Sequence, residues 1–87
     1  MKLSSNFSLS ELIKSQTAER HGISNMPTDE HIENLKLLCE NVLQPVRDQF
    51  GPVMISSGYR SENLSEKIGS SRKSQHCRGQ AADFECH

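Results

Sequence analysis

Residues 74–83 combine a histidine, a glycine and a carboxylate at spacings that could build part of a metal site. A neutral imidazole, such as that of His76, and a carboxylate, such as that of Asp83, are ligands that zinc accepts at ~2.0–2.2 Å. Gly79 lies between them, where the absence of a Cβ lets the chain turn. Residues 81–86 are small and apolar enough for a short strand, which would hold Asp83 on a rigid support. We therefore predict half of a zinc site here.

The spacing of serine, histidine, glycine, alanine and aspartate in this stretch resembles the first zinc-binding motif of the zinc D-alanyl-D-alanine carboxypeptidase family. That family also includes the L-alanyl-D-glutamate endopeptidases of phage lysis enzymes. Residues 7–12, 43–48 and 53–61 look like the segments that precede the motif in one branch of the family, so the resemblance covers nearly the whole chain. It implies a zinc peptidase that cuts peptidoglycan stem peptides, with His76 and Asp83 as metal ligands.

The same resemblance assigns roles to two further residues. In this family the serine of the motif contacts the substrate, which implies a substrate-binding role for Ser74. The matching arginine faces the active site, so Arg60 would stabilise the substrate or developing negative charge with its planar donor fork. Without the resemblance, these side chains would be a loop hydroxyl and a solvated arginine. Tyr59 is expected to be a packing residue whose hydroxyl is tethered.

The pairs His76-Cys77 and Cys86-His87 leave open a different zinc site, a closed structural site of two histidines and two cysteines. Adjacent ligands cannot easily point at one ion, and a strand sends neighbouring side chains to opposite faces. The three cysteines lack the spacing of a disulfide framework. We expect them to be buried small hydrophobes or idle thiols.

The second half of the expected catalytic site is not found in these residues. Catalytic zinc usually has three protein ligands and a water, and the family takes its third ligand, a histidine, from a later segment that also supplies a glutamate as general base. His87 would lie ~13 Å from Asp83 along an extended strand, and Glu85, ~6.5 Å along it, does not match the family's glutamate. We therefore expect residues 1–87 to form a single incomplete domain, whether truncated, a fragment or degenerate. The alternative function is a non-catalytic cell-wall peptide-binding module or an inactive fragment.

Length and composition favour one small folded domain. A hydrophobic content of 33% and a charged content of 24% do not indicate disorder. The net charge of −1 provides no general field for nucleic acid or anionic lipid. No apolar run approaches the ~20 residues that span a bilayer, and the first residues lack the apolar region of a signal peptide. We expect a chain that is cytoplasmic at synthesis, without nucleic-acid binding or membrane insertion, and that reaches the cell wall after release if it is phage-derived.

The predicted helices come from capping and apolar periodicity. A capping-box pattern at Ser8 predicts a first helix over about residues 9–16. Thr28 is expected to cap the main helix, bent at Pro45 and reaching about Phe50. One apolar face of this helix should supply most of the core, with its side chains at three- and four-residue steps: Ile32, Leu35, Cys39, Val42 and Val46.

The second half of the chain should contribute strands and a short helix. We predict a strand over residues 53–57, a helix over residues 62–68 and a polar loop over residues 70–75 that delivers His76. The resulting fold class is α+β, with helices packed against a small antiparallel sheet as in the Hedgehog/DD-peptidase-like fold that the resemblance implies. Exposed edges of the two strands could promote self-association.

Overall fold

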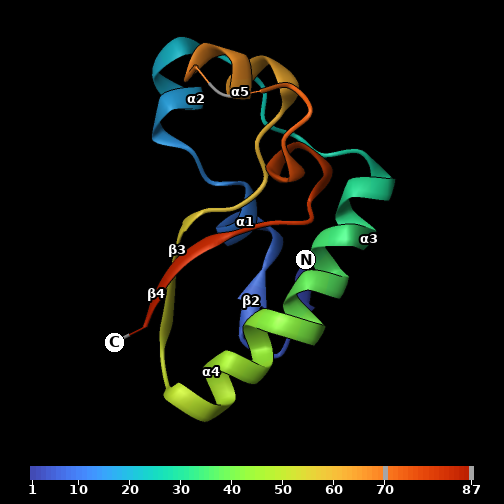
Figure 1. The fold of residues 1–87 in the computed structure, drawn as a ribbon, viewed down its shortest axis with the longest axis vertical. Helices are drawn as coiled ribbons and strands as arrows, with labels where there is room; N and C mark the ends of the chain where they lie inside the picture. The colour runs from blue at the N-terminus through green and yellow to red at the C-terminus, as the bar shows by residue number, and fades with distance from the viewer. Residues whose placement is uncertain (70, 87) are drawn as a thin grey trace.

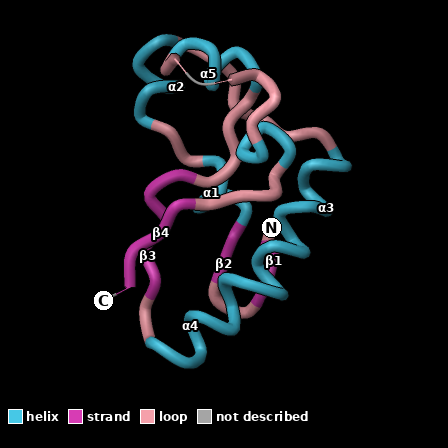
Figure 2. The backbone as a smooth tube through the Cα atoms, in the orientation of Figure 1, coloured by secondary structure: helices cyan, strands magenta, loops and turns pink. Residues whose placement is uncertain are grey.

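A computed structural model of the chain describes residues 1–69 and 71–86. Two small antiparallel sheets pack with helices, which confirms the α+β prediction (Figures 1 and 2). The elements in chain order are β1 (Lys2–Ser4), β2 (Phe7–Ser8), α1 (Leu9–Ile13), α2 (Gln16–His21), α3 (Asp29–Leu38), the π-helical turn η1 (Cys39–Leu43), α4 (Gln44–Phe50), β3 (Val53–Ser57), α5 (Glu62–Lys67), the 3₁₀ turn η2 (Gln75–Arg78) and β4 (Asp83–Cys86).

The N-terminal hairpin β1–β2 was not expected from the sequence. Its strands are antiparallel, with Lys2 opposite Ser8. The side chains of Leu3 and Phe7 are buried and belong to the main hydrophobic cluster. Figure 1 shows the hairpin between the α3–α4 helix and the β3–β4 sheet. The start of the chain therefore contributes to the core.

The prediction of one helix over residues 9–16 is wrong, because the chain forms two short helices there. Helix α1 ends at Ile13, and Ser15 is extended and caps α2, its hydroxyl accepting a hydrogen bond from the amide of Ala18 at 3.1 Å. Serine competes for backbone amides in this way and so starts helices more readily than it continues them. Gly22 ends α2 in the left-handed conformation, with φ of 65°.

The main helix begins and ends where the sequence predicts, but its middle differs. Thr28 caps α3, and α4 reaches Phe50. Ahead of Pro45, the turn η1 is π-helical, and the amide of Gln44 donates to the carbonyl of Cys39. A π-helical turn has more residues than an α-helical turn. Leu43, four residues after the buried Cys39, therefore lies on the core-facing side of the helix in place of Val42, three residues after it. The prediction that Val42 lies in the core is therefore wrong, because Leu43 is buried and Val42 is exposed.

Strand β3 has the predicted bounds, whereas β4 begins two residues later than expected, at Asp83. The strands pair antiparallel, with Ile55 opposite Phe84 and Ser57 opposite Asp83. Two steps along β3 therefore match one step along β4, which is the signature of a β-bulge. Each strand pairs on one side among the described residues, and association through the free edges stays a prediction.

The core lies between the helices and the two sheets. Its buried members are Leu3, Phe7, Leu12, Leu35, Cys39, Leu43 and Tyr59, and Ile55 and Phe84 pack against them from the β3–β4 sheet.

None of the helices in the described part of the chain is both long and apolar enough to span a bilayer. Helix α5 ends at Lys67, one residue before the predicted bound.

Candidate metal site

His76 lies on the 3₁₀ turn η2 rather than at the end of the polar loop predicted from the sequence. Ser74 caps this turn, because its hydroxyl accepts a hydrogen bond from the amide of His76 at 3.2 Å. The carbonyl of Ser74 also accepts from the amide of Cys77 at 3.0 Å. Gly79 then ends the turn with φ of 73°, a conformation that glycine adopts without steric cost.

The η2 turn is attached to the middle of helix α3. The side-chain amide of Asn34 donates to the carbonyl of Arg78 at 2.8 Å. Gly79 packs so closely that a Cβ there would lie 2.6 Å from the carbonyl oxygen of His31 and 3.0 Å from the Cγ of Leu35. The predicted role of Gly79 as a turn residue is thus joined by a second role, close approach between two backbones.

The imidazole of His76 is held in one tautomer by a backbone carbonyl. Its Nδ1 lies 2.8 Å from the carbonyl oxygen of Gly58. Because a carbonyl oxygen can only accept a hydrogen bond, Nδ1 carries the proton and the lone pair of the neutral ring is on Nε2. Histidines that bind a metal through one ring nitrogen usually donate a hydrogen bond of this kind from the other, which orients the ring. The side chain is 13% exposed, which leaves it largely fixed but still accessible.

Asp83 faces the free nitrogen of this ring. The Asp83 Oδ2 lies 3.7 Å from the Nε2 of His76, and the aspartate side chain is 67% exposed. Two ligands that each bind one zinc ion at ~2.0–2.2 Å can be no more than ~4.4 Å apart. The two side chains therefore fit two positions of one zinc ion. The β-bulge opposite Asp83 and the hydrogen bond from the Ser56 hydroxyl to the Asp83 carbonyl, 3.1 Å long, help to fix its position.

The described residues bring two candidate ligands together at this place and no cluster of three. Among the side chains that the structure describes, those of residues 1–69 and 71–85, no group of three or more histidines, cysteines, aspartates or glutamates could hold a metal. His87, considered above as a substitute third ligand, lies outside the described residues. The assignment of His76 and Asp83 as zinc ligands stays a prediction, and zinc would need further ligands to complete its coordination.

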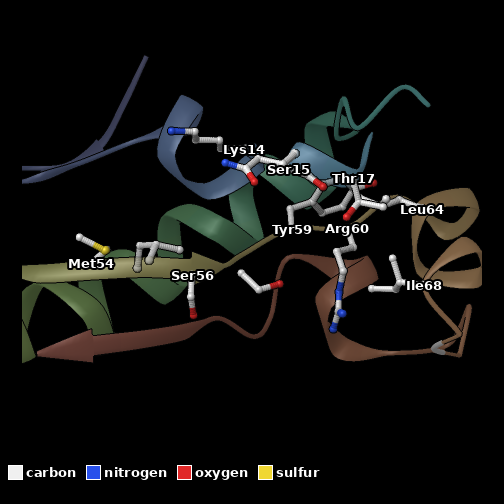
Figure 3. A pocket seen from close by; sticks show the side chains of 12 residues that line it. Lys14, Ser15, Thr17, Met54, Ser56, Tyr59, Arg60, Leu64 and Ile68 are labelled. Carbon is white, nitrogen blue, oxygen red and sulfur yellow. The ribbon is translucent and has the colours of Figure 1, made fainter. Parts of the chain in front are cut away.

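The backbone of Arg60 is bonded to that of His76. Its amide donates to the carbonyl of His76 at 3.1 Å. Its Nε is buried and has no hydrogen-bond partner among the described residues. Arg60 lines a pocket of about 530 Å³ between the α1–α2 connection, β3 and α5. Figure 3 shows the Arg60 guanidinium and the Lys14 ammonium at opposite ends of this pocket, so the two cations do not converge.

Ser74 and Tyr59 have clear structural roles. The hydroxyl of Ser74 is engaged with the His76 amide, and its contact with substrate stays a prediction. Tyr59 is buried, as expected, and its hydroxyl lies 3.3 Å from the Nδ1 of His31. Burial raises the pKa of Tyr59 above its usual value of 10.0, because a phenolate would lose its hydration.

The cysteines that the structure describes behave as buried small residues. Cys39 is fully buried, and burial raises its pKa from 9.0 to about 11. The Cys77 thiol is also buried and lies 3.9 Å from the carbonyl oxygen of Ser71. The other half of the alternative Cys/His site, the side chains of Cys86 and His87, lies outside what the structure describes.

Asn25, a residue with no predicted role, bonds to the backbone on both sides of Arg60. Its side-chain nitrogen donates to the carbonyls of Ile13 and Tyr59 at 2.7 and 3.0 Å, and its oxygen accepts from the amide of Ser61 at 2.6 Å. The sequence carried only a weak signal, an asparagine two residues before a proline. Its partners are 12 to 36 residues away along the chain, which no local pattern reveals.

One comparison with known proteins gives a match. A family model described as Peptidase M15 matches residues 5–87, which is nearly the whole chain. Searches of curated proteins and of solved structures found no significant match. The matched range includes His76, Asp83, Ser74 and Arg60. The chain therefore belongs to the peptidase M15 family, the zinc peptidases that its sequence resembles.

Proposed function

We propose that this chain forms part of the active site of a zinc peptidase that acts on peptidoglycan stem peptides. The observation that carries the proposal is the geometry of one residue pair. The His76 Nδ1 donates to the Gly58 carbonyl, so in the neutral ring the lone pair is on Nε2, which lies 3.7 Å from a carboxylate oxygen of Asp83. Membership in the M15 family supports the same assignment.

In this proposal each side chain acts through its own position. His76 and Asp83 hold the metal from a 3₁₀ turn and a strand end. The His76 ring is bonded to Gly58, the residue after β3, and Asp83 pairs with β3 itself. Arg60, whose amide is bonded to the His76 carbonyl, binds the peptide or the negative charge that develops on it. Ser74 contacts the peptide beside the turn that it caps. Zinc bound here would polarise the scissile carbonyl and activate a water.

Zinc titration of the whole chain by calorimetry tests the metal site. We expect weak binding, because two protein ligands leave positions for water to fill. Changing His76→Ala or Asp83→Ala should each abolish most of the binding. Matched controls are His21→Ala and Asp29→Ala, which remove an exposed histidine and an exposed aspartate elsewhere and should leave the affinity unchanged. Equal effects of the site and control variants would reject the site.

The alternative function, a module that binds cell-wall peptide without cutting it, is favoured by one observation. The described residues place only two potential zinc ligands together, whereas catalytic zinc usually has three protein ligands. Release of peptides from purified peptidoglycan, measured with and without added zinc, separates the two functions. Zinc-dependent release that His76→Ala abolishes supports the peptidase, and binding of peptidoglycan without release supports the module.

A further inference from the structure

The backbone around Arg60 is held by a single side chain, that of Asn25. The Asn25 Nδ2 donates to the carbonyl of Tyr59 at 3.0 Å, just before Arg60. The Asn25 Oδ1 accepts from the amide of Ser61 at 2.6 Å, just after it. The same Nδ2 also donates to the carbonyl of Ile13, 2.7 Å away at the end of α1. One amide group therefore clamps both peptide groups that flank Arg60 and ties them to a helix end.

The chemistry of this clamp requires an asparagine. Two of its partners are carbonyl oxygens, which only accept, and the third is a backbone amide, which only donates, so the orientation of the Asn25 amide is fixed. Aspartate would retain the oxygen for Ser61 but would have no hydrogens for the two carbonyls. Alanine would leave all three part-buried groups without their partner, which is costly.

The side chain of Arg60 depends on this backbone for its direction. Its Nε is buried but has no hydrogen-bond partner among the described residues. The remaining backbone contact of Arg60 is its own amide, which donates to the His76 carbonyl at 3.1 Å. Two consecutive peptide groups are therefore fixed. The Tyr59–Arg60 group is bonded to Asn25 and to the His76 carbonyl, and the Arg60–Ser61 group is bonded to Asn25. These contacts set the direction in which the Arg60 side chain leaves the backbone.

We propose that Asn25 is a positioning residue, which holds the Arg60 guanidinium in the direction that meets a bound peptide. This inference rests on the proposed function, in which Arg60 binds the peptide. Asn25 itself takes no part in the chemistry. Because small displacements of a binding group are known to cost large factors in rate or affinity, loss of the clamp should weaken peptide binding while leaving the zinc ligands in place.

The chain contains a matched control for this clamp. Gln44 is a second amide hub, far from Arg60, that ties α4 to the N-terminal hairpin. Its Oε1 accepts from the Ser4 hydroxyl and the Asn6 amide at 2.8 and 2.9 Å, and its Nε2 donates to the Asn6 side chain and to Asp48, both at 2.8 Å. Gln44→Ala therefore removes a comparable number of hydrogen bonds without touching the Arg60 segment.

The first experiment measures the position of Arg60 directly by ¹⁵N NMR of its Nε–H group. In Asn25→Ala the Nε–H resonance should shift and its order parameter should fall, whereas Gln44→Ala should leave both as in the wild type. Asn25→Asp, which keeps the Ser61 contact, serves if the alanine variant does not fold, and it should show the same direction of change. An unchanged Nε–H signal in the Asn25 variants, or an equal change in Gln44→Ala, would overturn the proposal.

The second experiment is a double-mutant cycle on binding of a synthetic stem pentapeptide that ends in D-alanyl-D-alanine. If Asn25 acts through Arg60, Asn25→Ala should weaken peptide binding roughly tenfold or more in the wild-type background and have little effect in an Arg60→Ala background. Additive losses would overturn the proposal. A wild-type chain that binds no pentapeptide would instead count against the proposed function, and the Nε–H comparison would still decide the role of Asn25.

Discussion

Gly58 lies directly against Leu12, so closely that a Cβ at position 58 would overlap the Leu12 carbonyl oxygen. The carbonyl of the same glycine accepts the hydrogen bond from the His76 ring. The next residue, Tyr59, donates its amide to the Leu12 carbonyl at 2.6 Å. The end of α1 therefore sets the position of the carbonyl that orients the candidate zinc ligand.

We expect Gly58→Ala to destabilise the fold and to disturb His76. Overpacking of this kind costs ~1–3 kcal/mol or more, and relief of the overlap must move the 58 carbonyl away from the imidazole. Urea unfolding should show the loss of stability, and the His76 ring resonances should shift. Gly22→Ala is the control, because a Cβ there meets none of the described atoms within 4 Å. Gly22→Ala should lower the stability only by the strain of an alanine in the left-handed conformation. A shift of the His76 resonances in that variant would contradict the explanation.

Ser74→Ala should separate the structural role of this hydroxyl from its proposed contact with substrate. Loss of a serine cap typically costs ~0.5–2 kcal/mol, so the η2 turn should loosen, which thermal unfolding would show. Ser74→Thr retains the hydroxyl and should restore the stability. If Ser74→Ala lowers pentapeptide affinity under conditions in which that variant is fully folded, and Ser74→Thr restores the affinity, the hydroxyl contacts the peptide as well. If alanine changes neither property, both roles are wrong.

Gly79→Ala should lower the stability of the fold more than substitution of a glycine that only forms a turn. The left-handed conformation costs an alanine ~1–2 kcal/mol, and the new Cβ would lie 2.6 Å from the His31 carbonyl oxygen, which forces η2 away from α3. Gly69 also has a left-handed φ, 85°, but a Cβ there would meet none of the described atoms within 4 Å. Gly69→Ala therefore measures the cost of the left-handed conformation alone. In chemical unfolding, the free energy of unfolding should therefore be lower for Gly79→Ala than for Gly69→Ala. Equal losses of stability would show that the close approach of Gly79 to α3 is unimportant.

The free energy of unfolding should decrease in alkaline solution because of Cys39. Its pKa is raised by burial from 9.0 to about 11, so between these values the unfolded chain loses a proton that the folded chain retains. The stabilisation is complete below pH 9 and is lost as the pH rises through 11, by about 1–3 kcal/mol. Cys39→Ala should flatten the slope in this interval when unfolding is measured at several pH values. An identical slope in both proteins would contradict the assignment.

Local sequence patterns determined the elements that depend on nearest neighbours. The cap at Thr28, the strand at Val53–Ser57 and the glycine turn at Gly79 could all be predicted, because capping, β-branching and positive φ act within a few residues. The motif spacing in residues 74–83 also identified the family, which the comparison of residues 5–87 confirmed.

Only the tertiary structure decided how these parts meet. The π-helical turn before Pro45 exchanged Val42 for Leu43 in the core, since a proline's effect on a helix depends on what packs against it. The Gly58 carbonyl that orients His76 and the Asn25 clamp on Arg60 both join residues at least 18 positions apart. Such contacts depend on where whole elements pack, and the intervening chain carries no periodic pattern that encodes them.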